Sequence, residues 1–117
     1  RVARELPELL EQLADVSKHE VYVIKAWTSD EQDPYHCAGI AADFRFVDCQ
    51  LPIGVQFELL SSFREIGGLG LVQRAPGALY EWHVDLRTGR RREHWTKILG
   101  QVNRHLGAVT PFAWSFA

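Results

Sequence analysis

The chain has 117 residues and a mass of 13.4 kDa, which predicts a single compact domain over residues 1–117. Hydrophobic residues make up 46% and charged residues 24%, a globular composition that excludes disordered and fibrous classes. The formal net charge of −2 gives no reason to expect nucleic acid or an anionic membrane as a partner. No apolar run approaches the roughly 18–20 residues of a membrane-spanning helix.

The two cysteines, Cys37 and Cys49, are too few for a disulfide scaffold or for a zinc site made of thiolates. Their spacing leaves open whether they form one bridge. The five histidines are therefore the side chains that merit tracing as candidate ligands.

The first part of the chain predicts one helix and two strands. Residues 3–16 predict a helix because leucines recur at three- and four-residue spacing. Residues 21–27 are β-branched and aromatic and predict a strand. Residues 28–35 are polar and contain Pro34, which indicates a loop, and the alternation over 40–47 predicts a second strand.

The middle of the chain predicts a helix followed by two strands. Apolar spacing over 57–66 indicates a short helix that ends at Gly67 and Gly68. Strands are expected over 69–72 and 79–86, separated by a turn.

The last part of the chain is basic and then amphipathic. Residues 87–92 are interpreted as a solvated basic loop, and 93–106 predict a helix. The inward face of that helix would carry Trp95, Ile98, Leu99 and Val102. Residues 108–117 are apolar and are not assigned to an element. The fold class expected from these elements is α+β, a small antiparallel sheet with helices packed on one side.

Polar residues occupy one face of each of two expected strands. In the strand over 40–47, Asp43 lies on one face while Phe44 and Phe46 point to the core. His36 leaves the preceding loop, and Gly39 lets the backbone approach closely. A histidine and a carboxylate can therefore converge.

The strand over 79–86 has a second polar face. It carries Glu81, His83 and Asp85, and Trp82 lies on the opposite, apolar face. Two histidines and one aspartate are the protein ligands of a catalytic zinc site with an open fourth position. Zinc lowers the pKa of water towards about 7, and Glu81 is placed to move the proton.

Each of these polar residues also fits an ordinary structural role, and spacing alone does not decide between the two. His83 between two acids is typical of a hydrogen-bonded surface histidine, and Glu81 and Asp85 of solvated strand residues near Arg87 or Arg90. His94 and His105 would share a face of the expected helix but lie too far apart to chelate one ion.

Two segments together resemble a known superfamily. Residues 36–43 read H-x-x-G-x-A-x-D, the signature of zinc D-Ala-D-Ala carboxypeptidases, phage L-alanyl-D-glutamate endolysins and the hedgehog signalling domain. Residues 67–70 (GGLG), 82–85 (WHVD), 88–91 (TGRR) and Trp95 resemble the second half of that pattern. The resemblance covers about residues 20–95.

The resemblance implies a hedgehog/D-Ala-D-Ala peptidase-like fold and a zinc cofactor. It implies His36, Asp43 and His83 as zinc ligands, Glu81 as the catalytic base, and Asp85 and Lys25 as residues that support a ligand or contact the substrate. The implied activity is hydrolysis of peptidoglycan stem peptides, as a carboxypeptidase or endopeptidase, in a periplasmic, extracellular or phage-associated setting.

The chain departs from the superfamily pattern at two places. Pro34 stands where many members have serine two residues before the first ligand. Residues 25–28 (KAWT) stand where many peptidases have a turn whose arginine polarises the substrate carbonyl. An alternative is therefore a binding or structural module that keeps the fold and the zinc without hydrolysis.

Overall fold

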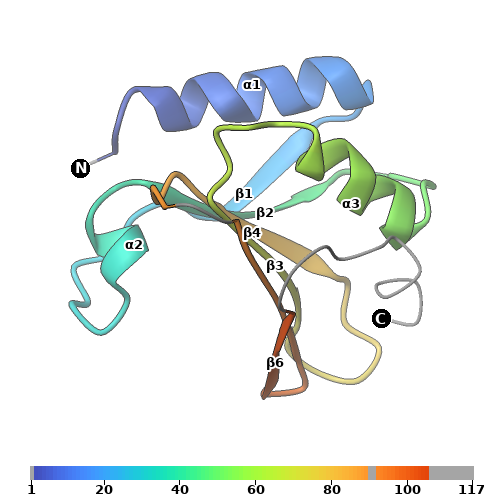
Figure 1. Cartoon of the computed structure of the whole chain (residues 1–117). Helices are drawn as coiled ribbons and strands as arrows, with labels where there is room; N and C mark the ends of the chain where they lie inside the picture. The colour runs from blue at the N-terminus through green and yellow to red at the C-terminus, as the bar shows by residue number, and fades with distance from the viewer. Residues whose placement is uncertain (1, 90–91, 106–117) are drawn as a thin grey trace.

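The structure of the chain, a computed structural model, describes residues 2–89 and 92–105 (Figure 1). Three helices and six strands follow one another along these residues: α1 (Glu5–Ser17), β1 (Val21–Lys25), α2 (Pro34–Cys37), β2 (Ala41–Phe46), α3 (Ile53–Ser61), β3 (Gly68–Gln73), β4 (Glu81–Asp85), β5 (Glu93–Ile98) and β6 (Gln101–His105). No helix among them is long and apolar enough to cross a membrane.

The six strands form one open sheet in the order β1-β2-β4-β3-β5-β6. Neighbouring strands are antiparallel except β3 and β5, which are parallel. The α+β class is confirmed. The expected purely antiparallel sheet is wrong, because the segment that follows β4 returns to pair with β3 instead of forming a helix.

One face of the sheet is packed against α1 and α3, and this layer is the hydrophobic core (Figure 1). Each helix contributes the apolar side of its turns, and each central strand contributes every second residue. The buried apolar residues of the core are Leu6, Leu9, Leu13, Ala42, Phe44, Phe46, Phe57, Leu60, Ile66, Leu69, Leu71, Trp82 and Val84. The small helix α2 lies on the other side of the sheet, beside β2.

The early elements lie close to where the sequence predicts them. The leucine repeat forms α1, and the alternating segments form β1 to β4. Helix α3 begins at Ile53, directly after Pro52, and ends at Ser61, so it starts and finishes earlier than expected. The loop expected over 28–35 ends in α2, whose first turn accepts Pro34 because proline there lacks only an N–H that has no helical partner.

The helix expected over 93–106 is wrong. Residues 93–98 and 101–105 form the antiparallel strands β5 and β6, joined by a tight turn at Leu99 and Gly100 with φ values of 51° and 86°. Two consecutive residues with positive φ are typical of the two-residue hairpin turns that match strand twist. The backbone of β3 would otherwise present an unpaired edge, so β5 satisfies it. His94 and His105 are opposite each other on neighbouring strands.

The described residues of the basic segment, 87–89 and 92, form a loop as expected, but Arg87 and Arg92 are half-buried and hydrogen-bonded instead of simply solvated. The guanidinium group of Arg92 donates hydrogen bonds to the carbonyl oxygens of Ser61, Phe63 and Ile66, at and beyond the end of α3. A cation at the end of a helix satisfies carbonyl oxygens and complements the helix dipole. Arg87 is drawn into the site described below. Residues 90, 91 and 106–117 lie outside the described residues.

Candidate metal centre

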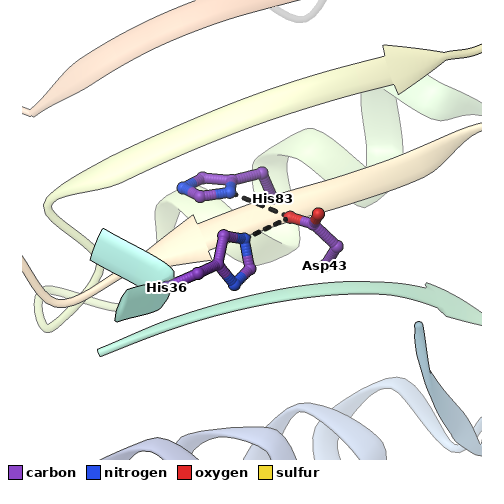
Figure 2. Close-up of side chains that lie close together, drawn as sticks. All are labelled: His36, Asp43 and His83. Atoms are coloured by element: carbon purple, nitrogen blue, oxygen red, sulfur yellow. Dashed lines mark hydrogen bonds and ion pairs between the residues drawn. The ribbon is translucent and has the colours of Figure 1, made fainter. Parts of the chain in front are cut away.

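The three predicted ligands come together from three elements on the face of the sheet away from the core. His36 lies on α2, Asp43 on β2 and His83 on β4 (Figure 2). Asp43 and His83 are direct partners in the β2–β4 register, so their side chains leave the sheet side by side. Gly39, with a φ of 77°, turns the chain from α2 into β2 and allows His36 to face Asp43.

Both imidazole rings point at the same carboxylate oxygen. Nε2 of His36 lies 3.1 Å and Nδ1 of His83 lies 2.9 Å from Oδ1 of Asp43 (Figure 2). One ligand atom from each residue lies within 4.8 Å of the other two. His36 is 2% and Asp43 6% exposed. Among the described residues, Nδ1 of His36 finds no hydrogen-bond partner, so Nε2 makes the only polar contact of this buried ring.

The charges of the cluster favour a bound cation. Burial would raise the pKa of Asp43, but hydrogen bonds from His36 and His83 outweigh it and hold that pKa well below its usual value. Burial would lower the pKa of His83, but its hydrogen bonds to Asp43 and Asp85 raise it. Asp43 is therefore a carboxylate at neutral pH, and the position between the rings attracts positive charge.

Asp85 holds the far side of the His83 ring. Its Oδ2 accepts a hydrogen bond from Nε2 of His83 at 2.8 Å, and Arg87 donates to both carboxylate oxygens, each at 2.8 Å. Asp85 is fully buried. Burial would raise its pKa, but the hydrogen bonds from His83 and Arg87 lower it to about 2. With Nε2 committed to Asp85, Nδ1 of His83 is the nitrogen left for a metal, the usual arrangement in histidine-ligated sites.

Glycines of the GGLG segment make room for this arrangement. A Cβ atom on Gly68 would lie 2.3 Å from Oδ2 of Asp85, and one on Gly70 would lie 2.5 Å from the Trp95 ring. That ring packs against His83, with ring centroids 5.0 Å apart. The close approach of backbone and side chains therefore requires glycine at both positions.

The site lies on one row of residues that crosses the whole sheet. From β1 to β6 the paired residues of this row are Lys25, Asp43, His83, Gly70, Trp95 and Arg104. The hairpin of β5 and β6 therefore supplies one wall of the site, which the expected helix would not have done.

Lys25 takes its place in that row because β1 is irregular. The register shifts between Val23 and Lys25, so Lys25 rather than Ile24 stands opposite Asp43. Its ammonium group, however, forms an ion pair with Oδ2 of Asp33 at 2.9 Å. Lys25 thus ties β1 to the residue that precedes α2, and the structure does not bring its Nζ to the three ligands.

Glu81 lies on the same face of β4 as His83, and its carboxylate is paired with an arginine. Nε of Arg74 donates to both of its carboxylate oxygens, at 3.1 and 3.0 Å. The same guanidinium group extends toward the metal cluster, where Nη2 lies 3.7 Å from Oδ2 of Asp43. Arg74 was not singled out from the sequence. The antiparallel pairing of β3 with β4 brings residue 74 near residue 81, and a predicted hairpin over these two strands is the feature that could have identified it.

An open groove of about 520 Å³ reaches the cluster at His83. Arg87 lines this groove, and its Cζ lies 3.8 Å from the Tyr35 ring centroid and 5.3 Å from the Trp95 ring centroid. The groove is lined by Asp33, Tyr35, His83, Arg87, Glu93, Trp95, Val102 and Arg104. One side comes from α2 and the residue before it, and the other comes from the β5–β6 hairpin.

The arrangement can hold one divalent ion through two nitrogen atoms and one oxygen atom, with a groove beside it for a ligand. Both cysteines are free and neither belongs to the cluster. Comparisons with protein-family models, with curated proteins and with solved structures find no match to this chain.

Proposed function

We propose that the chain is a zinc-dependent hydrolase that cleaves peptide bonds of peptidoglycan stem peptides, as a carboxypeptidase or endopeptidase of the endolysin type. The observation that carries this proposal is the convergence of His36, Asp43 and His83, with one ligand atom of each within 4.8 Å of the others. Two imidazoles and a carboxylate favour zinc over magnesium or calcium, which prefer all-oxygen sites. The resemblance of these residues and of the GGLG and WHVD segments to zinc D-Ala-D-Ala carboxypeptidases and L-alanyl-D-glutamate endolysins supports the substrate class.

The residues around the ligands have roles that suit hydrolysis. Zinc held there supplies a Lewis acid that activates water and polarises a carbonyl oxygen. Asp85 keeps the His83 ring oriented through Nε2. Glu81, two residues before His83 on the same face, takes a proton from water and returns it to the leaving amine. The groove beside His83 receives the peptide, in a periplasmic, extracellular or phage-associated setting.

A second candidate is a zinc-containing binding or structural module without hydrolysis, associated with the cell wall or a phage particle. The observation that favours it is the ion pair of Lys25 with Asp33, which keeps the amine away from the three ligands, where a peptidase of this type would need a cation to polarise the substrate carbonyl. In that case the metal would hold α2 onto the sheet, and the groove would bind peptide without cleaving it.

Zinc content and cleavage measured on the same samples separate the two candidates. We would incubate the zinc-loaded protein with purified peptidoglycan, quantify newly formed amino groups, and measure bound zinc by elemental analysis. The hydrolase predicts that Glu81→Gln keeps the zinc and loses cleavage by about a hundredfold or more. Glu58→Gln, on the exposed side of α3, is the matched control and should cleave like the parent.

Each remaining outcome has a definite meaning. Zinc without cleavage in the parent would support the binding module and reject the hydrolase. Cleavage by Glu81→Gln at the parental rate would remove Glu81 as the base. A parent that takes up no zinc would reject both candidates.

A further inference from the structure

Arg74 joins the metal cluster to the residue proposed as the base. It follows β3 and reaches across β4 toward β2, so that one guanidinium group lies beside two carboxylates. Nε donates to Glu81, and Nη2 lies 3.7 Å from Oδ2 of Asp43. The second oxygen of Asp43, Oδ1, faces the two imidazole rings. The two oxygens of Asp43 therefore have different neighbours.

This difference bears on how Asp43 holds a metal. A carboxylate whose two oxygens have no other partner can bind a divalent ion through both of them. The second oxygen then takes a coordination position on the metal that water or substrate needs. A guanidinium group beside Oδ2 leaves Oδ1 as the oxygen available to the metal. The same cation also lies between two largely buried carboxylates, since the Asp43 side chain is 8% and the Glu81 side chain 13% exposed.

We propose that Arg74 is a positioning residue: it restricts Asp43 to metal binding through Oδ1 and fixes the carboxylate of Glu81 on the face of the sheet that carries the three ligands. The part that concerns Glu81 rests on the proposed function, and the part that concerns Asp43 does not.

A purely stabilising role for Arg74 explains its contacts with Glu81 and Asp43 less well than a positioning role. The Arg74 side chain is 54% exposed, and ion pairs of such residues contribute little to stability. The geometry instead uses a property specific to arginine, a planar fork with several donors that can address two acceptors at once. Lysine, with one charged atom, keeps the charge but cannot hold both carboxylates in place.

The proposed role predicts opposite effects on metal binding and on turnover. Arg74→Gln removes a cation beside the centre and frees Oδ2 of Asp43, so zinc should bind as tightly as in the parent or up to about tenfold more tightly. Turnover at zinc saturation should fall by about tenfold or more, in kcat rather than in KM, because Glu81 is no longer held. Arg74→Lys should bind zinc like the parent and recover part of the turnover.

We would measure the zinc dissociation constant by competition with a chromophoric chelator, together with kcat and KM on peptidoglycan fragments. Arg64→Gln is the matched control, because Arg64 is exposed and removed from the cluster. Its zinc affinity and turnover should equal those of the parent. Thermal unfolding in chelator identifies any variant that fails to fold; Arg74→Lys then serves as the test.

A crystal structure of the zinc-loaded parent tests the Asp43 part without any activity. We expect one Asp43 oxygen on zinc and the second beside Arg74; zinc bound through both oxygens would overturn the proposal. A folded Arg74→Gln whose zinc affinity falls by more than about tenfold would overturn it too. Full turnover in that variant would overturn the Glu81 part. If the parent itself does not cleave, the proposed hydrolysis and the Glu81 part fail together, while the zinc measurements still decide the Asp43 part.

Discussion

Replacement of Asp85 by asparagine should destabilise the metal-free protein by about 2 kcal/mol at pH 7, and the loss should disappear in acid. The side chain is fully buried, and the hydrogen bonds from His83 and Arg87 lower its pKa from 3.8 to about 2. Each unit of lowered pKa corresponds to about 1.4 kcal/mol of preference for the ionised form in the folded state. Asparagine has a similar shape but lacks the charge that Arg87 and His83 stabilise.

The sign of the pH dependence follows from the lowered pKa. Above 3.8 the carboxylate is ionised in both states, and its full contribution to stability is present. As the pH falls through 3.8 toward about 2, the unfolded chain binds the proton first and the contribution declines. Roughly half of it should remain near pH 3, and the parent and Asp85→Asn should converge below that.

Urea unfolding in the presence of chelator measures this difference, with fluorescence of the buried Trp82 as the signal. With a slope of about 1.5 kcal/mol per molar urea, the midpoint at pH 7 should fall by about 1.3 M. Asp15→Asn, on the exposed side of α1, should shift stability by less than about 0.5 kcal/mol. Equal stability of Asp85→Asn and parent at pH 7, or a difference that does not decline in acid, would refute the reasoning.

Three further predictions concern the metal and the backbone. Zinc at about 100 times its dissociation constant should stabilise the protein by about 2.7 kcal/mol, so chelation should lower Tm by roughly 10 °C; an unchanged Tm would contradict the metal site. Gly68→Ala should cost more than about 2 kcal/mol in urea unfolding, because its Cβ would lie 2.3 Å from Oδ2 of Asp85. Gly77→Ala, where a Cβ meets open space at a φ of 77°, should cost only about 1 kcal/mol, and equal losses would exclude the steric explanation. Leu99→Asn should stabilise the protein by about 0.5 kcal/mol, since asparagine tolerates a φ of 51° better than leucine; a loss of stability would argue against the β5–β6 turn.

Strict alternation is what made the two central strands of the site predictable. In β2 and β4 every second residue is apolar and buried, so the register that buries Phe44 and Trp82 also places Asp43 and His83 together on the opposite face. A shift by one residue would move aromatic side chains into solvent. The pairing of the two ligands was therefore encoded in the pattern of the core.

The β5–β6 hairpin was not predictable from apolar spacing. Trp95, Ile98 and Val102 recur at three- and four-residue intervals, which suits a helix as well as two strands. Two strands form instead of a helix because the edge of β3 needs a pairing partner, which is a tertiary requirement. The turn between the two strands is indicated in the sequence only by Gly100. Arg74 escaped prediction for a similar reason, because its partners depend on how β3 and β4 pair.

The irregularity in β1 shows a third limit. Simple alternation would put Lys25 on the face opposite to that of Ile24 but could not say which of them stands opposite Asp43. The shift between Val23 and Lys25 settles this, and the ion pair with Asp33 then determines where the amine lies. No composition signal marks the bulge.

Zinc stoichiometry tests the central claim most directly. The protein would be stripped with chelator, incubated with zinc, freed of unbound metal by gel filtration and assayed by elemental analysis, beside His36→Ala and the control His19→Ala. His36 provides a buried ligand atom of the cluster, whereas His19 lies at the end of α1, away from it. We predict about one zinc per chain in the parent and in His19→Ala, and almost none in His36→Ala. A parent without zinc, or a folded His36→Ala that still holds a full equivalent, would contradict the site.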